Sequence, residues 1–183
     1  MAISDLFRGR ALNAVDAKGR VSLPAEYRST IQTRHRRAVL EDGFDPSADD
    51  ADERRRTGKV AIIVKDPDQP CLVGYENSYA REKRREIDLR HADKAGIERE
   101  RAIRKDLGYF GASEDMLWDA NGRVVLSPRQ RAKVGIDGFV YFFARGETFE
   151  MWNPVTFYQV HLEEDPGAAE ECRDFCEERG IAL

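Results

Sequence analysis

The sequence predicts an α+β fold built from two similar halves of one chain. One observation is a pattern of strand, tight turn, strand and helix start that begins near residue 9 and again near residue 112. Another is that short apolar runs bounded by turn residues follow each copy, as expected for buried strands. A third is a highly charged segment of helical composition, residues 78–107, that separates the copies. These observations indicate a duplicated unit of strands and helices.

The first copy is organised around residues 16–20, Asp-Ala-Lys-Gly-Arg. Aspartate favours the first position of a type I turn and glycine the fourth, so Asp16 to Gly19 can reverse the chain. Gly19 then supplies the left-handed residue that places a bulge in a hairpin. Arg20 therefore leaves the turn at a fixed angle, beside an exposed tip that carries Lys18.

The same turn motif recurs at residues 119–123, Asp-Ala-Asn-Gly-Arg. A single turn of this kind is weak evidence, because its aspartate and arginine can simply stabilise the turn. A shared fold unit explains the strands and helices of both copies, but it does not require an arginine at the same offset in both tips. With position 16 aligned to 119, seven pairs are identical: Asp16/Asp119, Ala17/Ala120, Gly19/Gly122, Arg20/Arg123, Val21/Val124, Leu23/Leu126 and Arg28/Arg131.

The first half continues with a helix, a charged segment and two strands. Pro24 suits the first position of a helix, where its missing N–H costs nothing, and we expect this helix to end near residue 32. Residues 33–59 have few apolar side chains and blocks of opposite charge, which predict a mobile, solvated insertion; the alternative is an arm that tracks DNA. Residues 60–64 and 71–75 are typical of neighbouring buried strands.

The linking segment and the second half have recognisable helix signals. Ser127, Pro128 and Gln130 predict a helix with an N-cap, a proline at N1 and a capping-box glutamine. The other expected elements are two helices within 78–107 broken near 91–96, which lie over the sheet or join subunits, a hairpin of 139–143 and 149–152, a helix from Asn153-Pro154 to about 162, and a frayed acidic helix over 163–183.

These residues give the chain a resemblance to the MraZ family of bacterial transcriptional regulators, whose two repeats each resemble the AbrB-type swapped-hairpin DNA-binding domain. The matching features are Phe7-Arg8-Gly9, both Asp-x-x-Gly-Arg turns, Gly111-Ala112-Ser113-Glu114 and Phe149-Glu150-Met151-Trp152. They cover most of the chain in the right order. The long segment between residues 33 and 59 and the acidic end after Leu162 depart from the family pattern.

The resemblance implies two SpoVT/AbrB-like swapped-hairpin β-barrel halves, related by an internal pseudo-two-fold and with helices outside. The repeats would cover residues 9–77, including the charged insertion 33–59, and residues 112–156; residues 78–107 would link them, and 157–183 would form a helix end and an acidic tail. It also implies a ring-like homo-oligomer that binds double-stranded promoter DNA, at repeated G-rich elements upstream of the division and cell-wall gene cluster.

The candidate DNA-binding residues lie in and around the two turns. A two-stranded ribbon fits the major groove, where an arginine can donate two hydrogen bonds to guanine O6 and N7. Because the second tip carries Asn121 in place of Lys18, we expect the first repeat to dominate the affinity; Arg123 has the alternative of packing at a subunit interface. The predicted site comprises Arg20 and Arg123 for base contact, Arg8, Arg10 and Lys18 for phosphate, and Asp16, Gly19, Asp119 and Gly122 for the turns.

The distribution of charge is compatible with nucleic-acid binding, although the net charge of the 183 residues is −4. Residues 1–40 carry eight Lys/Arg against three Asp/Glu, whereas residues 161–183 carry two Arg against eight Asp/Glu. No apolar run has the length of a bilayer span, the first residues lack a secretory signal, and three cysteines fit a reducing compartment. We therefore expect a cytoplasmic, nucleoid-associated protein without a membrane partner.

Catalysis and metal binding find little support in the sequence. The three histidines lie far apart, and neither a nucleophile motif nor a Gly-rich phosphate loop accompanies them. His161, Cys172 and Cys176 could at most give three metal ligands, whereas closed structural zinc sites take four. We expect a protein that is not an enzyme and has no small-molecule substrate, metal or cofactor. The alternative to a DNA-binding regulator is an AbrB-like protein-interaction module that blocks a partner and needs no DNA-contacting arginine.

Overall fold

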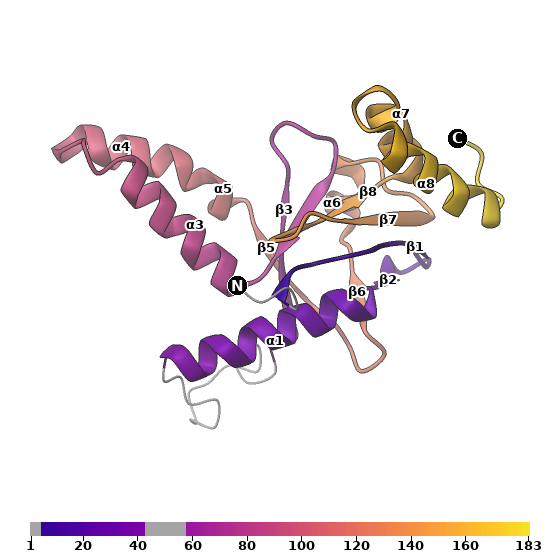
Figure 1. Ribbon diagram of the computed structural model, residues 1–183, viewed down its shortest axis with the longest axis horizontal. Coiled ribbons are helices and arrows are strands. Elements are labelled where there is room, and N and C mark those ends of the chain that lie inside the picture. Colours follow the sequence, from indigo (N-terminus) through magenta and orange to yellow (C-terminus); the bar gives the residue numbers. More distant parts are fainter. Residues whose placement is uncertain (1–4, 43–57) are drawn as a thin grey trace.

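The computed structural model describes residues 5–42 and 58–183, which form an α+β fold (Figure 1). Its strands are β1 (Arg10–Ala14), β2 (Arg20–Ser22), β3 (Val60–Lys65), β4 (Leu72–Tyr75), β5 (Glu114–Leu117), β6 (Arg123–Val125), β7 (Phe139–Ala144) and β8 (Phe149–Trp152). Its helices are α1 (Ala25–Asp42), α3 (Asn77–Arg90), α4 (Gly96–Asp106), α5 (Gly108–Gly111), α6 (Pro128–Lys133), α7 (Pro154–Glu164) and α8 (Pro166–Glu178). The predicted α+β class is confirmed, while most of the predicted insertion, residues 43–57, lies outside the described part.

The two halves of the chain exchange strands. The large sheet has the order β1-β7-β8-β4-β3-β5, and β2 and β6 form a separate two-stranded ribbon. Strand β1 of the first half pairs with β7 of the second, and β5 of the second half pairs with β3 of the first. Pairs β2–β6 and β4–β8 also join the halves. The counterparts in the two halves are β1 and β5, β3 and β7, and β4 and β8. When each strand is replaced by its counterpart, the same strand order results, read from the other edge of the sheet.

The registers of the strands follow the same exchange. Val21 lies opposite Val124 in the ribbon, and these two residues are equivalent in the sequence repeat. On either side of them, Arg20 lies opposite Val125 and Ser22 opposite Arg123, which again are exchanged equivalents. The pairing of the ribbon is therefore pseudo-symmetric at the level of single residues.

Two expectations about the strands require correction. The large sheet is open, with β1 and β5 at its edges, so the predicted barrel halves do not form a closed barrel in the described residues. The turn at residues 16–19 was expected to join two paired strands, but β1 lies in the large sheet and β2 in the ribbon. A hydrogen bond of 2.9 Å from the Asp16 amide to the Arg20 carbonyl closes this turn. A bulge bends and twists the chain locally, so the two strands diverge and find partners in the other half.

The main core lies between the large sheet and the ribbon. It combines Val21, Leu23, Val124 and Leu126 from around the ribbon, Ile63, Phe142, Phe149 and Met151 from the sheet, and Tyr27 and Ile31 from α1. A second cluster covers the opposite face of the sheet, where Tyr141 and Trp152 pack against Phe157 of α7 and Cys172 of α8. Because both clusters contain residues from both halves, the ribbon is supported by the whole fold.

Helix α1 runs to Asp42, ten residues beyond the predicted end near residue 32. Tyr27, Ile31 and Arg34 have helical spacing and are all buried. The apolar pattern in the sequence ends because the next buried position of this face is an arginine.

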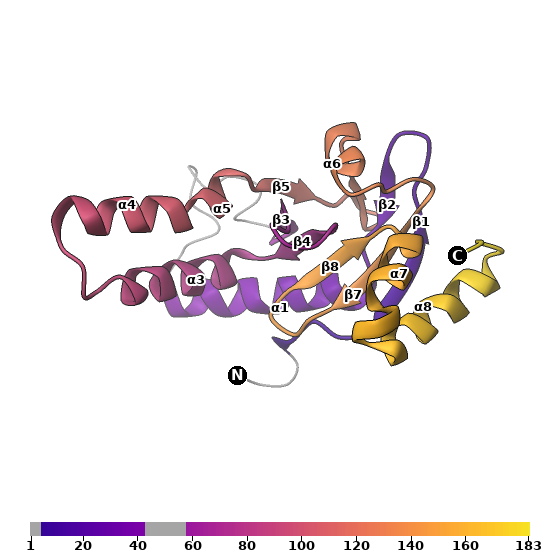
Figure 2. The same cartoon turned by 90° about the horizontal axis from the view of Figure 1, so that it is seen from above.

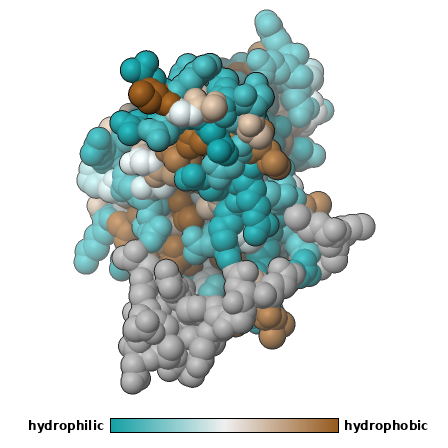
Figure 3. Space-filling view, turned by 90° about the vertical axis from the view of Figure 1, so that its left-hand side faces the viewer, coloured by the Kyte–Doolittle hydropathy of each residue, from teal (hydrophilic) through white to brown (hydrophobic). Residues whose placement is uncertain are grey.

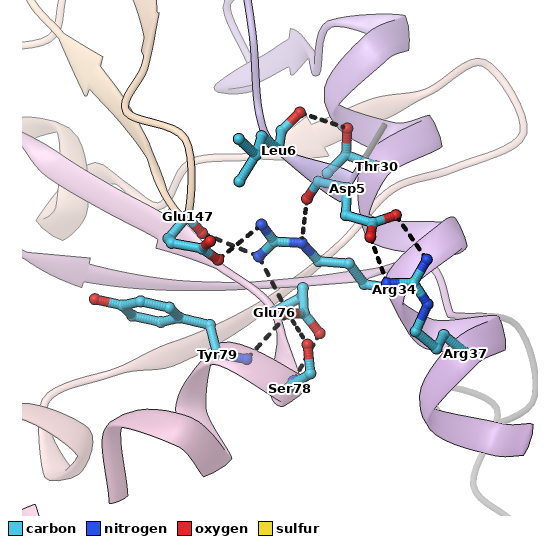
Figure 4. Close-up of polar contacts among 9 residues, drawn as sticks. All are labelled: Asp5, Leu6, Thr30, Arg34, Arg37, Glu76, Ser78, Tyr79 and Glu147. Atoms are coloured by element: carbon cyan, nitrogen blue, oxygen red, sulfur yellow. Dashed lines mark hydrogen bonds and ion pairs between the residues drawn. The ribbon is translucent and has the colours of Figure 1, made fainter. Parts of the chain in front are cut away.

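Arg34 joins four parts of the chain (Figure 4). Its Nε donates to the carbonyl of Asp5 at 2.6 Å, and its Nη2 donates to Glu147 Oε2 at 2.9 Å. Its Nη1 lies 3.4 Å from Glu76 Oε1, and Glu76 in turn caps the first turn of α3. The guanidinium carbon also lies 5.1 Å from the ring centre of Phe7. Burial of this charge is tolerated because paired carboxylates and a carbonyl satisfy it.

Helix α8 is packed rather than frayed, contrary to the prediction. Ala168, Ala169, Cys172 and Cys176 are buried and lie on one face of it. Asp165 caps the helix by accepting a hydrogen bond from the Ala168 amide at 3.1 Å. Small side chains form this apolar face, so the acidic residues between them dominated the sequence pattern.

Helices α3 and α4 project from the body as a helical arm, as two perpendicular views show (Figures 1 and 2). The predicted break is confirmed, since α3 ends at Arg90 and α4 begins at Gly96. These helices were predicted either to lie over the sheet or to join subunits, and the arm does not lie over the sheet (Figures 1 and 2). Leu89 and Ile97 are largely exposed on it, and the end view shows separate hydrophobic residues among hydrophilic ones (Figure 3).

Candidate nucleic-acid interface

The first turn has the conformation that the sequence predicted. Gly19 has φ of 78°, and its amide donates to the Asp16 carbonyl at 2.8 Å. The carboxylate of Asp16 accepts the amides of Lys18 and Arg20 through Oδ1, each at 2.9 Å. Its Oδ2 accepts from Arg20 Nε at 2.6 Å. Asp16 therefore organises the turn and also orients the side chain of Arg20.

The second turn repeats this geometry. Gly122 has φ of 74° and donates to the Asp119 carbonyl at 2.9 Å. Asp119 Oδ1 accepts the amides of Asn121 and Arg123, each at 2.9 Å. Its Oδ2 accepts from both Nε and Nη2 of Arg123, at 3.0 and 2.8 Å. Arg123 is thus held by two side-chain contacts where Arg20 is held by one.

Both turn aspartates are biased towards the ionised form. The pKa of Asp16 lies below its ordinary value because the Arg20 amide, and next the Arg20 side chain, donate hydrogen bonds to it. The pKa of Asp119 is also lowered, first by the side chain of Arg123 and then by its amide. The carboxylates therefore act as fixed acceptors in the turns, as expected for the alternative in which aspartate and arginine stabilise the turn.

This turn-stabilising contact leaves each arginine with free hydrogen-bonding capacity. A guanidinium has five N–H donors in a planar fork, and the aspartate uses one or two of them. The side chains of Arg20 and Arg123 are 36% and 35% exposed. Turn stabilisation and contact with an external acceptor are therefore compatible for the same arginine.

The outer face of the β2–β6 ribbon carries both arginines. Residues two apart on a strand share a face, and directly opposite residues share it as well. Arg20, Ser22, Arg123 and Val125 therefore lie together on the solvent side, while Val21 and its partner point into the core. Val125 is 58% exposed. The ribbon thus presents two cations, a hydroxyl and an apolar group on one surface.

Ser22 and Val125 were not identified from the sequence. The alternation of Val21 and Leu23 indicates that Ser22 points outward, and the same argument applies to Val125 between Val124 and Leu126. The missing information was the pairing of β2 with β6, because a local turn does not reveal a partner about one hundred residues away.

The predicted phosphate-binding residues are spread over the molecule. Lys18 is exposed at the tip of the first turn, and Asn121 is exposed at the tip of the second. Arg8 is also exposed, but it precedes β1 and does not belong to the tip. Arg10 begins β1, at the opposite end of that strand from the turn. The structure therefore brings Lys18 and Arg20 together but separates Arg8 and Arg10 from them.

Arg10 has other partners within the chain. It forms an ion pair with Glu171 of α8, and its guanidinium carbon lies 4.8 Å from the ring centre of Phe143. Its side chain is 26% exposed. These contacts attach the C-terminal helix to the edge of the large sheet, so Arg10 has less freedom to reach a phosphate than Lys18.

The cysteines and His161 have structural surroundings. Cys172 and Cys176 are buried, and burial raises the pKa of both thiols. The ring of His161 stacks on Phe157 with a centroid distance of 4.0 Å, and its Nδ1 lies 3.0 Å from the Phe157 carbonyl. Among residues 5–42 and 58–183, no group of three or more His, Cys, Asp or Glu side chains is arranged to hold a metal ion.

No helix in the described residues is long and apolar enough to cross a membrane.

Sequence comparisons show that the chain is similar to several proteins that share the same name. No family model matches it. It is 32% identical over 168 residues to "Transcriptional regulator MraZ" of Ruegeria pomeroyi, an alignment that covers 92% of this chain and 87% of that protein. The protein of the same name from Methylocella silvestris is 31% identical over 157 residues, or 83% of this chain and 76% of its own length. That from Ruegeria sp. strain TM1040 is 29% identical over 168 residues, with 92% and 89% covered.

Proposed function

Because the chain belongs to the MraZ family of transcriptional regulators, we propose that it regulates transcription by binding double-stranded promoter DNA through the outer face of the β2–β6 ribbon. The observation that carries this proposal is the placement of Arg20, Ser22, Arg123 and Val125 on one solvent-facing surface. Such a ribbon has the width to enter the major groove.

The chemistry of this face suits the edges of base pairs. The free donors of Arg20 and Arg123 match the O6 and N7 acceptors of guanine, and Val125 offers an apolar contact for the thymine methyl group. The hydroxyl of Ser22 can donate to or accept from either type of base pair. Lys18, at the exposed tip, supplies a cation for the phosphate backbone. Two arginines on one face are compatible with the G-rich targets that the family resemblance implies.

Further details of the proposal rest on the family resemblance. We place the target in repeated G-rich elements of the division and cell-wall gene cluster promoter, which would associate the protein with the nucleoid. The exchange of strands between the halves supports an AbrB-like swapped-hairpin relationship, with repeats at residues 9–77 and 112–156. A ring-like homo-oligomer would let several ribbons engage repeated elements at once, and avidity would then raise the total affinity.

The test is a binding titration with two DNA duplexes of equal length and composition. One contains repeated G-rich elements from such a promoter, and the other contains the same bases in scrambled order. We expect tighter binding to the first, with both affinities falling as salt rises. Equal affinity for the two duplexes would contradict sequence-specific binding, and no binding to either would favour the protein-interaction alternative.

A further inference from the structure

Two arginines outside the ribbon contact the turns in a crossed arrangement. Arg28 lies on α1 of the first half, and Arg131 lies on α6 of the second. They are the last identical pair of the sequence repeat, and both are half-buried. Neither belongs to the outer face of the ribbon, so contact with a base does not account for them.

Each of these guanidinium groups lies against the turn glycine of the other half. A Cβ atom added to Gly122 would lie 2.5 Å from Cζ of Arg28. A Cβ atom added to Gly19 would lie 3.5 Å from Nε of Arg131. Glycine is therefore needed in both turns for its conformation, and at Gly122 also for the close approach of Arg28; at Gly19 the close atom is the Leu126 carbonyl oxygen, 2.6 Å from an added Cβ, while Arg131 lies at ordinary contact distance.

Backbone hydrogen bonds reinforce both contacts. The amide of Leu23 donates to the Gly122 carbonyl at 3.0 Å, and the amide of Leu126 donates to the Gly19 carbonyl at 2.9 Å. Arg28 Nε donates to the Leu23 carbonyl at 3.1 Å, which fixes its guanidinium above the second turn. Each turn thus accepts a hydrogen bond from a backbone amide of the other half and packs against an arginine of that same half.

We infer that Arg28 and Arg131 are positioning residues that act across the two halves: Arg131 holds the turn that presents Arg20, and Arg28 holds the turn that presents Arg123. The turn glycine directly precedes the DNA-contacting arginine in the chain. A shift of the glycine therefore changes the direction in which that arginine leaves the turn. The consequence for DNA rests on the function proposed above, whereas the crossed contact can be tested in the free protein.

Amide hydrogen exchange, measured residue by residue by NMR without DNA, tests the crossed assignment. In Arg131→Ala, we expect exchange at the Gly19 and Arg20 amides to become about fivefold faster, because the packing of the guanidinium against the turn is lost and local opening of the turn becomes easier. Exchange at Gly122 and Arg123 should change by less than about twofold. Arg28→Ala should show the reverse pattern.

Matched controls separate this effect from the loss of a charge. Arg129→Ala on α6 and Arg36→Ala on α1 each remove an exposed arginine from the same helix, and both turns should keep their wild-type exchange. If the alanine variants fail to fold, Arg28→Lys and Arg131→Lys carry the test, because lysine keeps the charge and loses the planar group. We expect them to give the same crossed pattern at a smaller amplitude. Faster exchange in the turn of the substituted half, or equal change in both turns, would overturn the inference.

DNA titrations of the same variants distinguish the inference from the proposed function. Arg131→Ala should weaken binding to the G-rich duplex more than Arg28→Ala, because it loosens the turn that carries both Lys18 and Arg20. A crossed exchange pattern without any change in DNA affinity would support the positioning role and contradict the ribbon as the DNA-binding surface. Loss of affinity without the crossed pattern would contradict the positioning role.

Discussion

The two turns share a backbone and differ in what they offer to a partner. Residues 16–19 and 119–122 have the same hydrogen bonds and the same left-handed glycine, to within 0.1 Å and a few degrees. The first turn carries Lys18 at its tip and holds Arg20 through one side-chain contact. The second carries Asn121 and holds Arg123 through two. The geometry of the turn has thus stayed fixed between the copies, whereas the charge at the tip and the freedom of the arginine have diverged.

The largest expected difference concerns the two ribbon arginines. Arg20→Ala should cost about 1–3 kcal/mol of binding free energy per engaged site and relax discrimination at the contacted base. Arg123→Ala should cost less, because Arg123 is held more firmly by its own aspartate and lies beside no cationic tip. The measurement is a binding titration of each variant on G-rich and scrambled duplexes, with light scattering to monitor the oligomer.

An Arg20→Ala protein that keeps its oligomer and its wild-type specificity would contradict the proposed role of this residue. A change in oligomer size in Arg123→Ala alone would instead support the alternative that Arg123 packs at a subunit interface.

The turn glycines should differ in their effect on stability. Either Gly→Ala substitution places a side chain in the left-handed region, which costs about 1–3 kcal/mol. At Gly19, the new Cβ would also lie 2.6 Å from the backbone oxygen of Leu126, which cannot move without breaking the ribbon. At Gly122, the close atoms belong to the side chain of Arg28, which can move aside if it gives up its hydrogen bond to the Leu23 carbonyl. We therefore expect Gly19→Ala to lower the free energy of unfolding more than Gly122→Ala, as measured by urea denaturation; the opposite order would show that Arg28 is the more rigid neighbour.

Exchanging the tip residues should change affinity for all DNA sequences alike. Lys18→Ala removes one phosphate contact, so the salt dependence of binding should fall by about one unit per engaged subunit. Asn121→Lys adds a cation at the equivalent position and should strengthen binding to scrambled DNA. Titrations over a range of salt concentrations measure both effects. If Lys18→Ala changes specificity and leaves the salt dependence unaltered, Lys18 contacts a base and not a phosphate.

The smallest effect is expected when the pH is lowered until the turn aspartates become protonated. Because the pKa values of Asp16 and Asp119 are lowered below 3.8 in the folded protein, the contribution of these carboxylates is fully present above pH 3.8. It is lost as the pH falls through the folded-state values. The amide signals of Arg20 and Arg123 should therefore titrate with midpoints below 3.8, and Asp16→Asn should abolish the transition at Arg20 alone. A midpoint above 3.8 would mean that the carboxylate is not stabilised by its arginine.

The sequence predicted most of the local structure correctly. The two turns, the capping box formed by Ser127 and Gln130, and the strands of the large sheet follow from the spacing of a few residues. Each of these features is determined by neighbours in the chain, so a single sequence contains the necessary information.

The errors arose where distant contacts decide the structure. Helix α1 continues because a buried Arg34 is satisfied by Asp5, Glu76 and Glu147, none of which is near it in sequence. Helix α8 packs through small residues such as Cys172, which give a weak apolar pattern. The ribbon, with Ser22 and Val125 on its outer face, exists only through pairing between the halves. The two turn arginines and the conformation of their turns could therefore be predicted from the sequence, but the surface that they share could not.

The pair Val73 and Glu150, at the centre of the large sheet, shows what the presence of both halves in one chain permits. These residues occupy equivalent positions in the two halves and lie opposite each other in β4 and β8. In a dimer of identical chains the residue at this position would face its own copy, and a glutamate facing a glutamate is destabilising. Here Glu150 accepts hydrogen bonds from Trp152 Nε1 at 2.9 Å and Arg145 Nε at 3.0 Å, while valine stands across from it. Joining both copies in one polypeptide has released each position from matching its twin. The two halves can therefore carry different side chains at equivalent positions, which a dimer of identical chains cannot do.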